Sequence, residues 1–277
     1  MARGPLVLDA AMGTRLIARG LDLAGDDPAL WNLSHPEVVR ELHGRDVAAG
    51  SDAVVTNTFG ANRCWLARYG RAGDVTAINR RAVELARAAA GPGRFVVGSI
   101  GPTASRAPDA SREQAEALAV SGVDALLFET HSLEHAERAL DQVGGTVSLP
   151  LLVCLLDWPR SPAEPARRLA DLGAAALGAN CQHGMEPVLH LAEALHRVTD
   201  LPLILKPGAG LPGEPPASPE SFARAVSTLE ALGARLIGGC CGTTEAHVAA
   251  LRSACLPWNS PHHSTADGPP ERRGQTP

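Results

Sequence analysis

The chain of 277 residues has few aromatic residues, a single lysine and no long apolar run. Aromatic side chains make up 3% of the residues, so alanine, leucine and valine must fill most of the core. No apolar stretch approaches the roughly 20 residues that a membrane span needs. The first residues also lack the apolar run of a secretory signal peptide. These absences predict a cytoplasmic protein with no membrane partner.

Acidic residues slightly outnumber basic ones, with 30 Asp and Glu against 25 Lys and Arg. The formal net charge is −5, and no basic stripe stands out in the sequence, so we expect no nucleic-acid partner. The chain contains six cysteines. In a reducing compartment such cysteines favour metal binding or catalysis over a disulfide framework.

Short apolar runs alternate with helical patterns along the whole chain. Most of the runs are continuously apolar, which is typical of strands buried on both faces. The predicted strands are Pro5–Asp9, Ala53–Thr58, Arg94–Ile100, Ala125–Glu129, Leu151–Leu156, Ala174–Ala179, Leu203–Leu205 and Arg235–Gly239. The predicted helices are Pro36–Ala49, Val75–Ala89, Ser111–Ser121, Leu133–Val143, Pro162–Asp171, Met185–Val198, Pro219–Leu232 and Thr244–Ala254.

This alternation predicts an α/β protein with a single (β/α)8 barrel over residues 1–256. An open, doubly wound sheet is the alternative fold. Residues 257–277 are rich in Pro, Ser, His and Gly, and we expect them to form a disordered tail. The pair His262 and His263 lies in that tail, so we assign it no metal site.

The strongest chemical signal is the hexapeptide GGCCGT at residues 238–243. It falls where the eighth predicted strand ends, and the ends of barrel strands carry the catalytic residues. Glycine lets a backbone approach a ligand closely. We therefore interpret Cys240 and Cys241 as functional residues rather than as packing residues or a strained disulfide.

Two thiolates do not complete a catalytic zinc site, which usually has three protein ligands and one open position. Cys181, after the sixth strand, is the best candidate for the third ligand. Cys154 is a rival within the fifth strand, while Cys64 and Cys255 lie in helical stretches and are interpreted as packing residues. A substrate thiol in the open position would lose its proton and remain a nucleophile. Such a site favours alkyl transfer to sulfur over hydrolysis.

Polar side chains also follow other strands of the predicted barrel. Asp9 ends the first strand and Glu129 ends the fourth. Either carboxylate could hold the ammonium group of an amino acid, or serve only as a local hydrogen-bond acceptor. His131 and His183 lie near the same mouth, but a thiol activated by zinc needs no general base.

These motifs resemble the homocysteine S-methyltransferase family. That family includes betaine–homocysteine methyltransferase, enzymes that use S-methylmethionine, and the homocysteine module of cobalamin-dependent methionine synthase, which the chain resembles most. The resemblance runs from about Leu6 to Leu256. It is carried by DAAMGT at residue 9, HPEVVRELH at 35, AGSDAVVTNTFGAN at 49, GSIGPT at 98, LLFET at 126, GANC at 178, PGAGLP at 207 and GGCCGT at 238.

The resemblance implies a Zn²⁺ ion and the binding of homocysteine in a (β/α)8 barrel. The zinc ligands of the family correspond to Cys181, Cys240 and Cys241. The positions that bind homocysteine correspond to the carboxylates of Asp9 and Glu129 and, for the substrate carboxylate, to the backbone amides of Ala10 and Ala11.

The implied reaction is methyl transfer to the thiol of homocysteine, which forms methionine. The donor stays open among methylcobalamin on a separate protein, S-methylmethionine, S-adenosylmethionine and betaine, although the scarcity of aromatic residues disfavours betaine. The alternative is a zinc-thiolate subunit or a redox-sensing barrel within a larger methyltransferase assembly. Three features depart from the family pattern: Ala10 replaces a glycine, Gly208 replaces an asparagine, and the segment from Gly101 to Gly122 is short.

Overall fold

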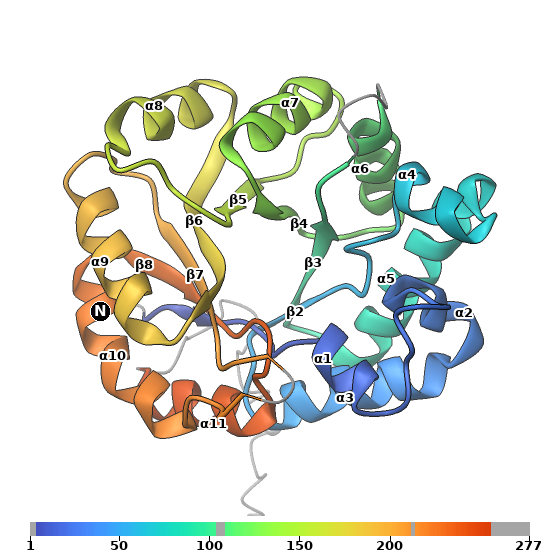
Figure 1. The fold of residues 1–277 in the computed structure, drawn as a ribbon, viewed down its shortest axis with the longest axis horizontal. Coiled ribbons are helices and arrows are strands. Elements are labelled where there is room, and N and C mark those ends of the chain that lie inside the picture. Colours follow the sequence, from blue (N-terminus) through green and yellow to red (C-terminus); the bar gives the residue numbers. More distant parts are fainter. Residues whose placement is uncertain (1–3, 104–108, 212–213, 256–277) are drawn as a thin grey trace, which may run out of the picture.

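The computed structural model describes residues 4–103, 109–211 and 214–255, which form a barrel of parallel strands inside a ring of helices (Figure 1). The strands run in the order β1-β8-β7-β6-β5-β4-β3-β2. They are β1 (Leu6–Val7), β2 (Ala53–Val55), β3 (Phe95–Ile100), β4 (Ala125–His131), β5 (Leu151–Leu155), β6 (Ala174–His183), β7 (Leu203–Gly208) and β8 (Ala234–Ile237). The predicted (β/α)8 barrel is confirmed, and the open sheet is wrong.

The helices of the outer ring also match their predicted positions. They are α3 (Pro36–Ala48), α5 (Val75–Ala90), α6 (Ala110–Val120), α7 (Leu133–Val143), α8 (Ala163–Asp171), α9 (Met185–His196), α10 (Pro219–Ala231) and α11 (Glu245–Ala254). No helix in the described ranges is long and apolar enough to cross a membrane. The predicted tail, residues 257–277, lies outside the described residues, as does its pair of histidines.

The connections after β1 and β2 contain short helices that the sequence did not predict. Each has five residues or fewer, too few for a helical repeat of apolar residues to be recognised. They are α1 (Gly13–Ile17), α2 (Trp31–Ser34), α4 (Arg63–Leu66) and the 3₁₀ turns η1 (Pro28–Leu30), η2 (Ala67–Tyr69) and η3 (Ala72–Asp74).

The strands bury both faces, as their continuous apolar runs predicted. Successive side chains of a strand point to opposite faces. Thus Leu127 of β4 packs inside the barrel, whereas Leu126 and Phe128 pack under the helices. The inner cluster consists of small and branched residues on the strands or, for the first of them, directly after β1: Leu8, Ala53, Val55, Val97, Ala125, Leu127, Leu152, Cys154, Ala176 and Ile204. Cys154 is therefore part of the barrel core.

The barrel closes between β1 and β2 through hydrogen bonds of Asp52 and Asp9. At the start of the strands, the Asp52 N–H donates to the Val7 carbonyl at 2.7 Å, and the Val7 N–H donates to the Asp52 carboxylate at 2.9 Å. At the mouth, the Val55 N–H donates to Oδ2 of Asp9 at 2.7 Å. The Asp9 carboxylate thus takes the place that a neighbouring strand's carbonyl would fill.

Two strands are irregular where they reach the mouth. The register shifts between Phe128 and His131 on β4 and between Asn180 and His183 on β6. Within these shifts Thr130 and Cys181 have positive φ angles of 63° and 61°. A β-branched residue such as threonine rarely adopts this conformation, and such strain gathers at functional sites. The irregularities re-aim the side chains that border the pocket described next.

Candidate metal centre and substrate pocket

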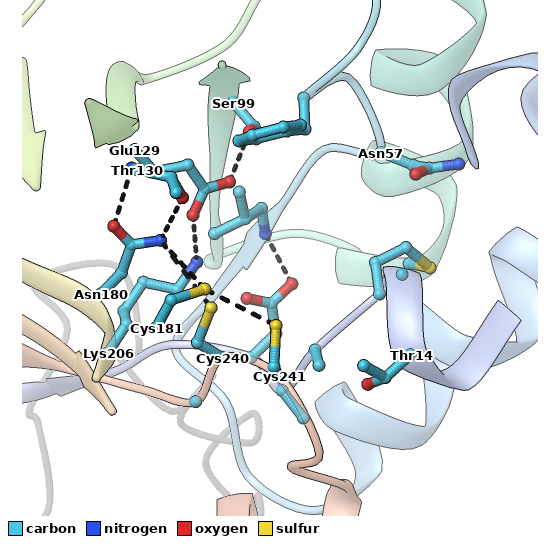
Figure 2. Close-up of a pocket in the computed structure, with 18 of the residues that line it drawn as sticks. Thr14, Asn57, Ser99, Glu129, Thr130, Asn180, Cys181, Lys206, Cys240 and Cys241 are labelled. Atoms are coloured by element: carbon cyan, nitrogen blue, oxygen red, sulfur yellow. Dashed lines mark hydrogen bonds and ion pairs between the residues drawn. The ribbon is translucent and has the colours of Figure 1, made fainter. Parts of the chain in front are cut away.

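Three cysteine side chains meet at the carboxyl-terminal mouth of the barrel (Figure 2). Cys181 lies on β6, while Cys240 and Cys241 follow β8. Their sulfur atoms all lie within 4.8 Å of one another, and the sulfur atoms of Cys181 and Cys241 are 3.5 Å apart. Within the described ranges no other group of three His, Cys, Asp or Glu side chains has this arrangement.

The spacing and chemistry of the cluster fit a divalent cation. Zinc–sulfur bonds of about 2.3 Å in a tetrahedral site place the sulfur atoms about 3.8 Å apart, close to the distances observed. The pKa of Cys240 is raised to about 12, first by its hydrogen bond with Cys181 and further by burial. A metal ion reverses this effect, because coordination deprotonates a thiol. The cluster can therefore hold a metal ion.

Gly238, Gly239 and Gly242 flank the two adjacent cysteines. Their role differs from the close approach to a ligand that the sequence suggested. A Cβ at Gly238 would lie 2.6 Å from Cβ of Leu8, and one at Gly239 would lie 2.2 Å from Oγ1 of Thr243. Gly242 has a φ of 79°, and a Cβ there would meet the Gly210 carbonyl at 2.2 Å. These glycines let the cysteine turn pack tightly against its neighbours, so close packing, and not close approach to a ligand, accounts for them.

A pocket of about 270 Å³ opens beside the thiols and contains Asp9 in its wall. Asp9 is 2% exposed, and its Oδ1 has no hydrogen-bond partner among the described residues. The other oxygen accepts the Val55 N–H. Burial raises the pKa of Asp9 to about 7, and nearby Lys206 opposes the rise. The free oxygen of Asp9 is thus an acceptor placed for a cationic group.

Glu129 lies in the same pocket, but both its oxygens have partners. Oε1 accepts a hydrogen bond of 2.5 Å from Ser99, and Oε2 lies 3.1 Å from Nζ of Lys206. Lys206 is 4% exposed. Burial alone would lower its pKa, but Glu129 and Asp9 raise that pKa overall above its ordinary value. The pocket therefore contains a fixed internal cation.

Sequence reasoning missed the role of Lys206 although a signal was present. It is the only lysine in the chain and directly follows the seventh predicted strand, which places it at the mouth of a barrel. The same reasoning missed Asn180 and Thr243, whose contacts with the cysteine loops have no counterpart in sequence spacing.

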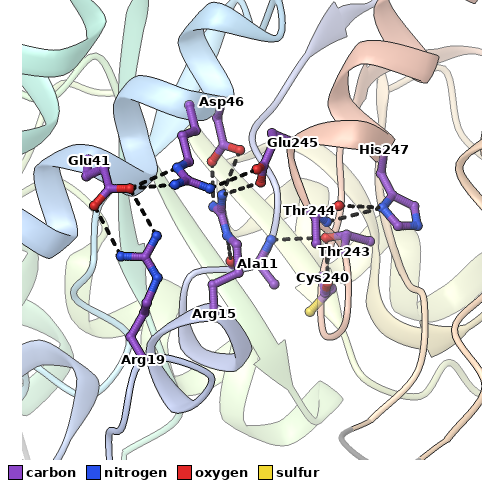
Figure 3. A network of polar contacts seen from close by, with 11 residues as sticks. Ala11, Arg15, Arg19, Glu41, Asp46, Cys240, Thr243, Thr244, Glu245 and His247 are labelled. Carbon is purple, nitrogen blue, oxygen red and sulfur yellow. Dashed lines mark hydrogen bonds and ion pairs between the residues drawn. The ribbon is translucent and has the colours of Figure 1, made fainter.

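The structure places Ala10 and Ala11 in the pocket wall and gives the Ala11 amide a partner within the protein (Figure 3). The Ala11 N–H donates to Oγ1 of Thr243 at 3.0 Å. Arg15 holds this loop by donating to the Ala11 carbonyl at 2.5 Å and to both oxygens of Asp46. That the amides of Ala10 and Ala11 bind a substrate carboxylate stays a prediction, with the Ala11 N–H already donating within the protein.

Thr243 connects this loop to the metal cluster. While it accepts from Ala11, its hydroxyl donates to the carbonyl of Cys240 at 2.7 Å. The first β-α loop and the cysteine turn are thus held in one rigid arrangement.

The two histidines considered near the mouth do not border the pocket. The ring of His131 is buried, and Nδ1 lies 3.0 Å from the Glu129 carbonyl. Burial lowers the pKa of His131 to about 4. His183 is exposed and faces Glu214 at 3.9 Å in a neighbouring cavity. Neither histidine is placed to act as a base in the pocket.

Comparison with known proteins identifies the family. Residues 6–255 match the profile of the homocysteine S-methyltransferases. The chain is 30% identical to methionine synthase of Mycobacterium tuberculosis over 90% of the chain and 24% of that protein. It is also 30% identical to homocysteine S-methyltransferase of Escherichia coli, over 90% of the chain and 94% of that protein.

A solved structure agrees with this result. The metallated form of the homocysteine methyltransferase MmuM from Escherichia coli has a TM-score of 0.76 and 29% identity, and the match covers 90% of this chain and 96% of that one. The chain spans about a quarter of the length of the mycobacterial methionine synthases that it matches. Because the family match extends over the barrel from β1 to α11, the chain belongs to the homocysteine S-methyltransferase family.

Proposed function

We propose that the chain transfers a methyl group to the thiol of homocysteine, with a zinc ion held by Cys181, Cys240 and Cys241. The observation that carries this proposal is the meeting of the three sulfur atoms within 4.8 Å at the mouth of the barrel. Thiolate ligands favour zinc among the common divalent ions. When bound, the ion supplies a position at which a substrate thiol ionises at neutral pH.

The pocket residues then orient the amino acid. Oδ1 of Asp9, which has no partner among the described residues, accepts the substrate ammonium group. Glu129, held by Ser99 and Lys206, adds a second negative charge at the pocket wall. Ala10 and Ala11 line the wall of the pocket. Their backbone amides bind the substrate carboxylate, and the Ala11 N–H does so by sharing the hydrogen that it donates to Oγ1 of Thr243.

The methyl transfer itself is a displacement at carbon. The ionised sulfur of homocysteine forms a bond to the methyl carbon while the bond from that carbon to the leaving group breaks. The leaving group departs with the electron pair, so a donor with a positively charged or otherwise good leaving group is required.

A panel of donors tests this function. Zinc-loaded protein is mixed with homocysteine and either betaine, S-methylmethionine, S-adenosylmethionine or a methylated corrinoid protein, and methionine is measured. Among the described residues that line the pocket, Phe59 is the only aromatic one, and quaternary ammonium groups bind best in aromatic cages. We expect betaine to be a poorer donor than a sulfonium by roughly tenfold or more. Failure of every donor would refute the function and favour a subunit of a larger assembly.

The ionisation of Asp9 predicts a pH dependence of substrate binding. Because its pKa is raised to about 7, the carboxyl is mostly protonated below that pH and charged above it. A thiol-free analogue such as 2-aminobutyrate should bind about tenfold more tightly at roughly pH 8 than at roughly pH 6. Inhibition constants measured across this range check the prediction. Asp9→Asn should abolish the pH dependence, and a flat profile in the unmodified protein would contradict the assignment.

A further inference from the structure

Asn180 lies between the thiol cluster and the end of β4, and the proposed reaction leaves it without a role. The residue is 1% exposed. Oδ1 accepts the Thr130 N–H at 2.8 Å, and Nδ2 donates to Oγ1 of Thr130 at 2.7 Å. The same nitrogen lies 3.7 Å from the sulfur atoms of both Cys181 and Cys240 (Figure 2). The amide thus connects the end of β4 to two of the three thiols.

The orientation of this amide is fixed by its surroundings. A backbone N–H can only donate, so the atom that faces the nitrogen of Thr130 must be the amide oxygen. The amide nitrogen therefore faces the sulfur atoms. One of its hydrogens is directed to the Thr130 hydroxyl, which leaves the other shared between two sulfur atoms at equal distances. The positive φ of Thr130 shows that this arrangement is maintained at the cost of backbone strain.

A metal centre of this kind presents a problem of selectivity. The substrate thiolate would share the ion with the thiolates of Cys181, Cys240 and Cys241, and all four are nucleophiles toward the same methyl donor. Methylation of a protein ligand would turn it into a neutral thioether and weaken the metal site. A hydrogen bond to a thiolate lowers the basicity of the sulfur, and the nucleophilicity of sulfur falls with its basicity.

We propose that Asn180 protects Cys181 and Cys240 from methylation by donating its amide hydrogen to their sulfur atoms, so that the methyl group is directed to the substrate. This inference rests on the proposed zinc site. Asn180 acts as a positioning residue, since it touches the ligands and not the substrate. Cys241 receives no hydrogen bond from Asn180 in the described structure and serves as an internal reference.

The test compares zinc-loaded wild-type protein with Asn180→Leu, which keeps a similar volume but donates no hydrogen bond. Both are treated with iodomethane without homocysteine. The carbon–iodine bond breaks, iodide leaves with the electron pair, and a carbon–sulfur bond forms at the thiolate attacked. Peptide mass spectrometry follows each cysteine. We expect methylation of Cys181 and Cys240, relative to Cys241, to rise about tenfold in the variant.

Asn180→Asp provides the matched control. An aspartate keeps an acceptor for the Thr130 N–H but has no amide hydrogen for the sulfur atoms. The Asp variant should behave like the Leu variant if donation to sulfur protects the ligands. A methylation ratio as in the wild type would mean that Asn180 only supports Thr130, and would overturn the inference. The Asp variant also gives the answer if the Leu variant does not fold.

The zinc content of each protein separates this inference from the proposed function. Wild-type protein that binds no zinc refutes the metal site itself. Variants that retain zinc and show an unchanged methylation ratio refute only the protective role of Asn180.

Discussion

Replacing Cys240 with serine is expected to remove the metal and the activity together. Cys240 belongs to the group of sulfur atoms that lie within 4.8 Å of one another, and a serine hydroxyl does not ionise at neutral pH to replace a thiolate. Even the outer partners of metal ligands change affinity by about 10- to 100-fold, so loss of a ligand should weaken zinc binding by at least about a hundredfold. Zinc content after dialysis and methionine formation are measured on the same sample.

Cys64→Ser is the control for this experiment. Cys64 is partly buried in α4 (Arg63–Leu66) and borders neither the pocket nor the thiol cluster. Its variant should keep full zinc content and activity. Full zinc occupancy in Cys240→Ser would contradict the assignment of Cys240 as a ligand, whatever the activity of that variant.

Lys206→Met is expected to destabilise the barrel strongly. The substitution fills a similar space but leaves the Glu129 carboxylate buried beside the apolar interior without its ion pair of 3.1 Å. Breaking a buried ion pair by removing one partner costs about 3–5 kcal/mol. For a domain of this size the Tm should fall by roughly 10 °C. Thermal and urea unfolding of the metal-loaded protein measure the effect.

Two further variants show whether the lost charge is the cause. Lys206→Met combined with Glu129→Gln should recover part of the stability, because the Glu129 charge is then no longer buried without its partner. Arg197→Met removes the exposed partner of Glu193, a pair 3.7 Å apart on the surface, and should change stability by less than about 1 kcal/mol. A double variant less stable than Lys206→Met would contradict this explanation.

The features that the sequence predicted are those that repeat or cluster along the chain. The apolar runs gave the strands, because a strand buried on both faces needs apolar residues at consecutive positions. The barrel then brought Cys181 and the pair Cys240–Cys241 to the same mouth, since parallel strands end on the same side. The strands follow from the local apolar pattern. The meeting of the cysteines follows from that pattern together with the rule that parallel strands of a barrel end on the same side.

The features that the sequence did not predict depend on contacts between distant loops. The bond of Ala11 to Thr243 spans 232 positions of the chain, and that of Thr130 to Asn180 spans 50. Neither residue spacing nor composition indicates which hydrogen bonds a loop amide makes. Asp9 shows the same limit: its place at the mouth was predicted, but not that one of its oxygens joins β1 to β2.

The burial of Lys206 also determines how the protein can be labelled. The chain has only this one lysine, and its side chain is enclosed at the pocket wall with 6% exposure. Amine-reactive dyes and cross-linkers therefore find no ε-amino group on the outer surface of the folded barrel. Such reagents should leave the ε-amino group of the folded barrel unmodified and react with it only after unfolding, so that its labelling reports on opening of the barrel.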